Sequence, residues 1–293
     1  MHPFGRVLTA MITPFTADGA VDHDTAHRLA RYLVDNGSDG LVVAGTTGES
    51  PTLSSDEKIA LFSTVKGAVG DRAAVVAGTS TYDTAESVEL TERAAGAGAD
   101  AILAVTPYYS KPEQRGLVAH FTAIADASDL PVMLYNIPGR TARLIEIPTL
   151  AELAGHDRIV AVKDAVMDID HTSEVCRTVP DLVVYSGQDS YTLPMMSVGA
   201  VGVVSVISHL AGRQVRAMVE AALAGDLPEA TRLHRALLPL CWACFLESNP
   251  GPVRSAMDQW WEPVGPPRSP VLPATDVTLA AIEAALIDLQ EHA

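Results

Sequence analysis

The sequence predicts an α/β protein in which eight parallel strands, each followed by a helix, close into a (β/α)8 (TIM) barrel. Short apolar runs recur eight times at the spacing of one strand plus one helix. Each run is apolar at successive positions, as expected for strands that are covered on both faces. The 293 residues leave room for an appendage, because such barrels typically occupy about 250 residues.

The eight predicted strands end in small or polar residues. They are Leu8–Thr13, Gly40–Gly45, Ala74–Gly78, Ala101–Thr106, Pro131–Tyr135, Ile159–Lys163, Leu182–Ser186 and Gly202–Val206. Strands that alternate with helical patterns indicate a parallel sheet with right-handed crossovers. Eight such units favour closure into a barrel over an open sheet.

Several helices between the strands have clear boundaries. Asp22 or Asp24 is a candidate N-cap for a helix that ends near Asn36-Gly37. Ser54-Ser55-Asp56-Glu57 resembles a capping box that opens a helix to Gly67. The helix from Thr84 ends in Gly96-Ala97-Gly98, which is a poor dinucleotide motif because it closes a helix instead of opening one.

After the eighth strand the pattern becomes helical. We expect helices over Leu210–Gly225, Pro228–Glu247, Pro252–Trp261 and Thr275–Glu291, with a proline-rich connector at 262–273. The sequence therefore predicts a catalytic barrel domain over residues 1–229 and a small helical C-terminal region over residues 230–293.

Composition excludes several classes of protein. The formal net charge is −16, and no cluster of basic residues suggests nucleic-acid binding. No apolar run reaches the roughly 18–20 residues of a membrane span, and the N-terminus lacks the pattern of a signal peptide. We therefore expect a cytoplasmic protein that binds neither nucleic acid nor membrane.

Cysteines and histidines give weak signals for redox or metal chemistry. Three cysteines are too few for a disulfide framework. Cys241 and Cys244 have the spacing of a dithiol site, but on a helix this spacing is also that of two packed side chains, the interpretation that we favour. His23 and His27 lie four residues apart without a third ligand, which is typical of a solvated helix face. We expect no metal and no organic cofactor.

The four lysines differ in their surroundings. Lys58, Lys66 and Lys111 lie among polar neighbours, where we expect them to be solvated. Lys163 ends an apolar strand, at the position where barrel enzymes place their chemistry. Burial there lowers the pKa of an amine, and a neutral amine can attack a carbonyl. The alternative is a buried lysine paired with Asp164 or another carboxylate.

Other strand ends carry compatible groups. Gly45-Thr46-Thr47-Gly48-Glu49-Ser50 can hold a carboxylate on free amides or form a plain turn, and it lacks the lysine of a P-loop. Thr106-Pro107-Tyr108-Tyr109 and Tyr135-Asn136 offer phenols that act as general acids and bases or simply pack. Arg140, in a Pro-Gly-Arg turn, suits recognition of a carboxylate.

Four motifs together resemble those of the dihydrodipicolinate synthase family, in the same order along the chain. They are Gly-Thr-Thr-Gly-Glu-Ser, Thr-Pro-Tyr-Tyr, Tyr-Asn-Ile-Pro-Gly-Arg-Thr and Val-Lys-Asp. This family, also called 4-hydroxy-tetrahydrodipicolinate synthase, belongs to the pyruvate-dependent class I aldolases, as does N-acetylneuraminate lyase. The resemblance extends from about Gly5 to the final helix. The motifs are specific together and weak singly.

The resemblance implies a set of roles. Lys163 would form an imine with pyruvate, and Tyr135 would shuttle protons through Thr46 to Tyr109, which reaches in from a neighbouring subunit. Thr47 and nearby amides would bind the carboxylate of pyruvate, and Arg140 that of aspartate semialdehyde. Gly187 and Val204 would line the pocket by backbone contacts. The protein would be a homo-oligomer, a tetramer built as a dimer of dimers.

Some positions depart from the family pattern. Asp164-Ala165-Val166 replaces the frequent Glu-Ala-Ser/Thr, and Ser186-Gly187-Gln188-Asp189 replaces Ser-Gly-Asp-Asp. Family members that lysine inhibits often carry His, His and Asn where this chain has Ser55, Lys58 and Tyr82, whereas Glu86 and Tyr108 match. Because Lys58 would repel a cationic effector, we expect weak or no inhibition by lysine.

The sequence therefore predicts a Schiff-base lyase that condenses pyruvate with L-aspartate 4-semialdehyde. An alternative is a pyruvate-dependent aldolase acting on a sugar acid or another aldehyde, but Arg140 favours the dipicolinate branch. A non-catalytic paralogue is disfavoured by the intact set of Lys163, Tyr135, Thr46 and Tyr109. A dithiol oxidoreductase based on Cys241 and Cys244 is disfavoured further.

Overall fold

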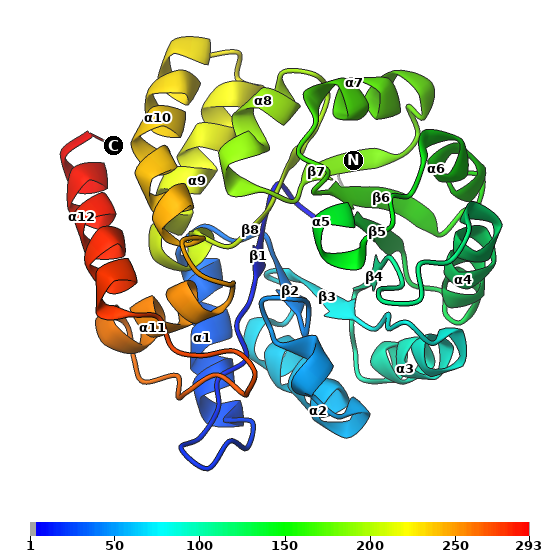
Figure 1. The fold of residues 1–293 in the computed structure, drawn as a ribbon, viewed down its shortest axis with the longest axis horizontal. Coiled ribbons are helices and arrows are strands. Elements are labelled where there is room, and N and C mark those ends of the chain that lie inside the picture. The colour runs from blue at the N-terminus through cyan, green and yellow to red at the C-terminus, as the bar shows by residue number, and fades with distance from the viewer. Residues whose placement is uncertain (1–3, 293) are drawn as a thin grey trace.

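The computed structural model describes residues 4–292, and its eight strands form a closed parallel barrel in chain order (Figure 1). The strands are β1 (Val7–Ala10), β2 (Gly40–Val43), β3 (Ala74–Gly78), β4 (Ala101–Val105), β5 (Val132–Asn136), β6 (Ile159–Asp164), β7 (Val183–Ser186) and β8 (Gly202–Ser205). β8 pairs with β1, which closes the barrel. The predicted fold is confirmed, and each expected run overlaps one strand.

Helices connect the strands and follow the last of them. They are α1 (His23–Asp35), α2 (Ser55–Val69), α3 (Thr84–Gly96), α4 (Gln114–Asp126), α5 (Pro138–Thr141), α6 (Ile147–Leu153), α7 (Ile169–Thr178), α8 (Thr192–Met196), α9 (Ser208–Leu223), α10 (Leu227–Ala243), α11 (Gly251–Trp260) and α12 (Asp276–His292). Two short 3-10 turns follow the second and seventh strands, η1 (Ser50–Thr52) and η2 (Asp189–Tyr191).

The helix ends follow the capping signals in the sequence. Asp22 caps α1 by accepting the N–H of Thr25. Ser54 and Glu57 form a capping box at the start of α2. That helix continues past the expected end at Gly67, which lies on an open face, and stops at Gly70, where φ is +57°.

Apolar side chains fill two layers. One fills the inside of the barrel and includes Leu8, Val42 and Met133. The other lies between the strands and the surrounding helices and includes Leu29, Phe62 and Phe121. The barrel interior is therefore a packed core, and space for a substrate remains only at its end.

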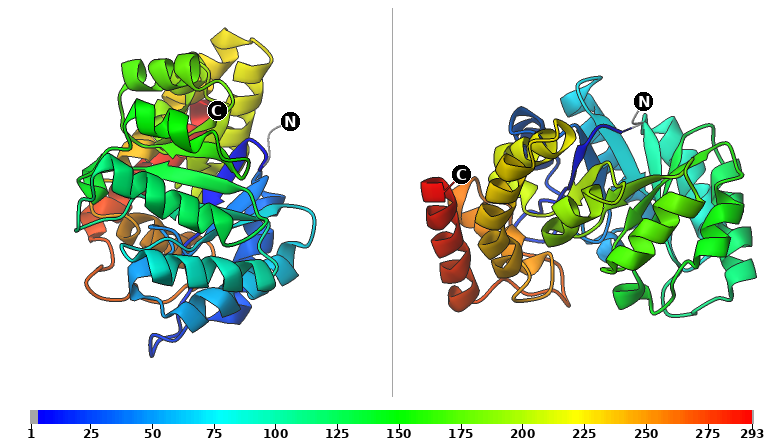
Figure 2. Two further views of the ribbon diagram at one scale, coloured as in Figure 1. Left: turned by 90° about the vertical axis from the view of Figure 1, so that its right-hand side faces the viewer. Right: turned by 90° about the horizontal axis from the view of Figure 1, so that it is seen from above.

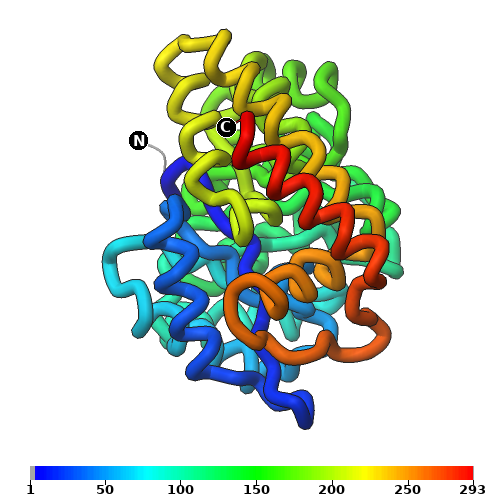
Figure 3. The backbone as a smooth tube through the Cα atoms, turned by 90° about the vertical axis from the view of Figure 1, so that its left-hand side faces the viewer, coloured from blue at the N-terminus to red at the C-terminus, as the bar shows by residue number. Residues whose placement is uncertain are grey.

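The C-terminal helices pack beside one side of the barrel rather than around it. Figure 2 shows α10 and α12 outside α9, and Figure 3 shows α11 next to them. A separate apolar cluster, which includes Val215, Leu240 and Ile282, holds these helices together. The boundary expected between residues 229 and 230 falls just inside α10, which begins at Leu227, and the division into two domains stays a prediction.

In residues 4–292, no helix is both long and apolar enough to cross a membrane.

Candidate active site

A cavity of about 210 Å³ opens at the carboxyl ends of the strands. Its polar lining includes Thr46, Ser80, Tyr108, Tyr135 and Arg140. The volume is below the roughly 300–1,000 Å³ of pockets for drug-sized ligands. The cavity therefore suits a small metabolite, and it lies where barrel enzymes carry out their chemistry.

Lys163 and Tyr135 face each other on neighbouring strands. The two residues are paired in the register of β5 and β6, and the Nζ atom of Lys163 lies 4.1 Å from the centroid of the Tyr135 ring. Both side chains are buried, with exposed fractions of 5% and 4%. In the part of the chain that the structure describes, residues 4–292, Lys163 has no ion-pair partner. The amine is therefore free to react with a carbonyl.

Asp164 does not neutralise Lys163. Successive residues of a strand point to opposite faces, and the Asp164 carboxylate accepts hydrogen bonds from the Val166 N–H and the Thr172 hydroxyl. Burial raises the pKa of Asp164, although those two hydrogen bonds partly offset it. The alternative of a purely structural Lys163–Asp164 pair is wrong.

Thr46 and Thr47 lie in the β2 loop, which we define as residues 44–50. Thr46 lines the cavity, and the next residue, Thr47, is buried. Within residues 4–292, the backbone N–H groups of Thr46 and Thr47 donate no hydrogen bond to the protein. Adjacent free amides of this kind can bind a carboxylate.

A buried ion pair fixes the β2 loop. Glu49 has a left-handed backbone (φ +57°), and its carboxylate lies 2.7 Å from Arg254 of α11, with both side chains 1% exposed. Arg254 also donates to the carbonyl groups of Thr13 and Val264. The neighbouring Asn249 donates to Thr47. Asn249 and Arg254 were not predicted from the sequence, because no local pattern connects them to a loop about two hundred positions earlier.

Tyr108 and Tyr109 lie in the β4 loop, which we define as residues 106–112, and their surroundings differ. Tyr108 is half-buried, lines the cavity and packs edge-on against Tyr82, with 5.3 Å between ring centroids. Tyr109 is 92% exposed and has a left-handed backbone (φ +68°). Within one chain, the structure therefore does not bring Tyr109 together with Thr46 and Tyr135.

Arg140 lies on the short helix α5, which follows β5, and it lines the mouth of the cavity. In residues 4–292 its side chain makes no ion pair. The adjacent Thr141 is buried and donates to the carbonyl group of Ile137, which fixes the turn. A guanidinium group placed in this way is available to a carboxylate ligand.

Gly187 and Val204 lie at the ends of β7 and β8. A Cβ atom on Gly187 would come within 2.8 Å of the Cβ of Ala165, so the position needs glycine. Val204 is buried inside the barrel. Asp189 supports this side by accepting the N–H groups of Val206 and Ile207, and burial raises the pKa of its carboxyl group.

Of the other three lysines, all expected to be solvated, Lys58 is instead buried. Lys111 is exposed, and Lys66 pairs with Asp100 at 2.8 Å. Lys58, expected to be solvated, is buried with an exposed fraction of 4%. It shares the inner face of α2 with Leu61, Phe62 and Val65, which follow it at helical spacing. Burial lowers the pKa of Lys58, while the Glu86 carboxylate raises it.

The lining also includes Gly78 and Ser80, to which the sequence analysis gave no role. Gly78 ends β3 and Ser80 follows it, so the rule that places functional residues at strand ends would have identified both. Gly78 is tight against the β2 loop, because a Cβ atom there would lie 2.4 Å from the carbonyl oxygen of Ala44.

The cysteine pair and the histidine pair singled out from the sequence do not line the cavity. Cys241 and Cys244 are free and buried among the C-terminal helices, as the packing interpretation expected, and burial raises the pKa of both thiols. The Nδ1 atom of His23 forms a hydrogen bond with the Thr64 hydroxyl group on the neighbouring helix α2. Within residues 4–292, no three His, Cys, Asp or Glu side chains are placed to hold a metal ion.

Comparison with known proteins agrees with this geometry. The model of the dihydrodipicolinate synthetase family matches residues 3–288. The 4-hydroxy-tetrahydrodipicolinate synthase of Moorella thermoacetica is 55% identical over 97% of both chains. The lysine-bound enzyme of Cyanidioschyzon merolae superposes with a TM-score of 0.96 at 43% identity, over 99% of both chains. A dihydrodipicolinate synthase from Bacillus anthracis superposes with a TM-score of 0.94 at 43% identity, over 98% of this chain and 99% of that one. The chain therefore belongs to the dihydrodipicolinate synthetase family.

Proposed function

We propose that this protein condenses pyruvate with L-aspartate 4-semialdehyde to give 4-hydroxy-tetrahydrodipicolinate. Relatives at 50–55% identity carry the name of that synthase. The observation that carries the proposal is the buried Lys163 amine, which lies 4.1 Å from the centroid of the Tyr135 ring, and Tyr135 lines the small cavity. We also place the enzyme in lysine and diaminopimelate biosynthesis, where this product is used.

The chemistry needs only the lysine as an electron sink. The amine of Lys163 adds to the ketone of pyruvate and loses water to give a protonated imine. Loss of a methyl proton gives an enamine, whose carbon attacks the aldehyde carbon. The amino group of the semialdehyde then attacks the imine carbon and expels the lysine amine, which closes the ring and frees the enzyme.

Proton transfer in these steps is assigned to Tyr135, Thr46 and Tyr109. Tyr135 is close enough to Lys163 to exchange protons with the groups that react there, and Thr46 and Tyr135 line the same cavity. A phenol can give and take a proton when neighbouring hydroxyl groups relay it. Tyr109 completes the relay from a second subunit, in agreement with its 92% exposure in a single chain.

Substrate binding is assigned to the remaining residues. Thr47 and the free amides of the β2 loop bind the carboxylate of pyruvate. Arg140, at the mouth of the cavity, binds the carboxylate of the semialdehyde. The backbone of Gly187 and of Val204 forms the opposite wall. No metal or organic cofactor takes part in this scheme.

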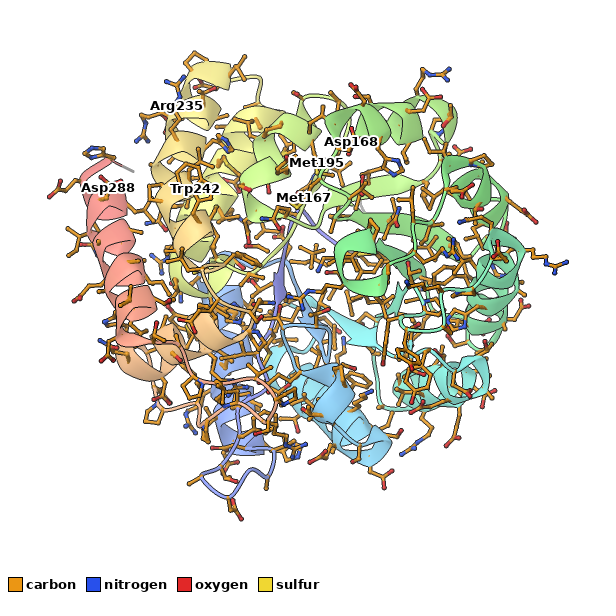
Figure 4. All side chains as sticks on the ribbon, in the orientation of Figure 1. Met167, Asp168, Met195, Arg235, Trp242 and Asp288 are labelled. Carbon is orange, nitrogen blue, oxygen red and sulfur yellow. The ribbon has the colours of Figure 1, made fainter. Side chains whose placement is uncertain are left out.

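The working protein is a homo-oligomer, a tetramer built as a dimer of dimers. Large apolar side chains are exposed on the single chain, among them Tyr82 and Leu227 and, labelled in Figure 4, Met167 and Trp242. The proposed assembly would cover part of this exposed apolar surface. The cytoplasmic location expected from the sequence stays a prediction.

Trapping of the imine tests the proposal. Incubation with pyruvate and borohydride should add one pyruvate-sized group to the peptide that contains Lys163. Lys163→Arg should abolish the adduct, and Lys58→Met, which changes another buried lysine, should retain it. No adduct, or an adduct at another lysine, would contradict the mechanism.

Turnover with a panel of aldehydes tests the second substrate. Aspartate semialdehyde should be consumed in preference to N-acetylmannosamine and small sugar aldehydes. Arg140→Ala should lose turnover with the semialdehyde by about 10–100-fold, as expected for a lost hydrogen bond between charged groups, while it still forms the pyruvate adduct. Unimpaired turnover would remove the role of Arg140.

A further inference from the structure

The C-terminal region contacts the β2 loop through buried polar groups. Arg254 of α11 pairs with Glu49 at one end of the loop, as described above. Arg268, in the connector after α11, donates its backbone N–H to the other carboxylate oxygen of Glu49 at 2.9 Å. Both residues come from a part of the chain that contributes no strand to the closed barrel.

A third contact reaches the substrate side of the loop. The Nδ2 atom of Asn249 lies 2.9 Å from the Oγ1 atom of Thr47. Both residues are buried, with exposed fractions of 6% and 3%. The Oδ1 atom of Asn249 is buried and has no hydrogen-bond partner within residues 4–292.

The contact fixes the direction of the Thr47 hydroxyl. An amide NH₂ group only donates, so Thr47 Oγ1 accepts from Asn249, and its own proton must be donated elsewhere. The adjacent backbone amides of Thr46 and Thr47 also have free protons. The hydroxyl and the amides therefore present donors together, which is the arrangement that a carboxylate requires.

We propose that Asn249 is a positioning residue for pyruvate: it holds the Thr47 hydroxyl as a donor towards the carboxylate of the substrate. This inference rests on the proposed function, in which Thr47 binds that carboxylate. Through Asn249, the C-terminal region takes part in substrate binding in addition to assembly.

Asn249→Asp tests the direction of the hydrogen bond with an isosteric change. A carboxylate at this position accepts the Thr47 proton instead of donating to the oxygen, and it adds negative charge near the negative substrate. The KM for pyruvate should rise at least about tenfold, as expected for loss of a hydrogen bond to a charged group. The KM for aspartate semialdehyde and kcat at saturating pyruvate should change by less than about threefold, because neither depends on free-enzyme binding of pyruvate.

A double-mutant cycle tests whether Asn249 acts through Thr47. Asn249→Leu and Thr47→Val should each raise the KM for pyruvate, and the double variant should be no worse than Thr47→Val alone, because residues in contact are not additive. Additive effects would show that Asn249 acts by another route and would overturn the inference. If Asn249→Asp does not fold, Asn249→Ser carries the same test, with an increase of at least about fivefold in the KM for pyruvate.

Glu247→Gln is the matched control. Glu247 belongs to the same segment but accepts from Thr275 and Thr278 at the start of α12 and does not touch the β2 loop. This variant should lower the unfolding midpoint and leave the KM for pyruvate unchanged. If the wild type forms its Lys163 adduct but folded Asn249→Asp has an unchanged KM for pyruvate, the positioning role is refuted. If the wild type forms no adduct, the proposed function itself is refuted.

Discussion

Two loops carry groups of the candidate site, and they are held in opposite ways. The β2 loop is buried and tied by Arg254, Asn249 and Arg268 from the C-terminal region. The β4 loop holds Tyr109, which is 92% exposed, and Lys111, and both have left-handed backbones at φ +68° and +47°. The structure supplies no comparable buried ion pair for this second loop in residues 4–292.

The difference shows which parts of the site one chain can complete. The β2 loop, to which we assign the binding of the first substrate, is preorganised within the chain, which reduces the cost of ordering it on binding. In the β4 loop, Thr106 is buried and donates to the carbonyl group of Tyr135, whereas Tyr109 is exposed, as its proposed role in a neighbouring subunit requires. We therefore expect changes in the β2 loop to alter stability, and changes in the β4 loop to alter activity through assembly.

Arg254→Met should give the largest loss of stability. It leaves the Glu49 carboxylate buried without its partner, which costs about 3–5 kcal/mol of unfolding free energy. Urea denaturation measures the change. Arg28→Met is the matched control, because its pair with Glu262 is 50% and 40% exposed and is worth about 0–1 kcal/mol. Equal losses in the two variants would contradict the view that the β2 loop is held by its buried pair.

Tyr109→Phe should lower kcat about 100-fold, the usual contribution of a general acid or base, with no change in the unfolding midpoint of the chain. Mixing it with Lys163→Ala under conditions of subunit exchange should restore activity, because a mixed pair contains one site with both groups. Tyr135→Phe mixed with Lys163→Ala is the control and should stay inactive, since both residues belong to one subunit's site. No recovery in the first mixture would place Tyr109 within its own chain's site.

Acid should weaken the connector that supports the β2 loop. The Arg268 guanidinium, which donates to Glu57, lowers the pKa of that carboxyl from 4.5 to about 2. A depressed folded-state pKa means that the stabilisation is complete above pH 4.5 and is lost as the pH falls towards 2. Glu57→Gln should therefore be about 1–2 kcal/mol less stable than wild type near neutrality, and the gap in unfolding free energy should close in that acid range. A gap that does not vary with pH would contradict the assignment.

Lysine should have the smallest effect. The family resemblance implies that an effector lysine would bind near Lys58 and Glu86, where the buried Lys58 cation would repel it. Initial rates measured at rising L-lysine concentrations should stay constant through the micromolar range. Inhibition in that range would refute the prediction and would show that Lys58 moves or loses its proton on binding.

The sequence was sufficient for the barrel and for the groups at the strand ends. The apolar runs recur regularly, and a parallel barrel brings their carboxyl ends together, so Lys163, Tyr135 and Thr46 could be predicted to meet. The burial of Lys58 was also visible in its spacing from Leu61, Phe62 and Val65, but its charge favoured the solvated interpretation. Periodicity was the stronger signal there.

Asn249 and Arg254 could not be predicted in the same way. Each is one polar residue in a helical region, and its partner lies 202 or 205 positions away in the sequence. Such contacts depend on how α11 docks against the barrel, which no local pattern specifies. The fold was thus predictable from local spacing, while the support of the site was not.

The pairing of Glu49 with Arg254 also sets the order in which a newly made chain can become active. The two residues are 205 positions apart, so at about 5–20 residues per second Arg254 leaves the ribosome roughly 10–40 s after Glu49. Until then the first strands can pair, but the carboxylate that will be buried has no counter-ion. A chain cut short before α11 therefore contains every proposed catalytic residue but lacks the counter-ion that holds the β2 loop.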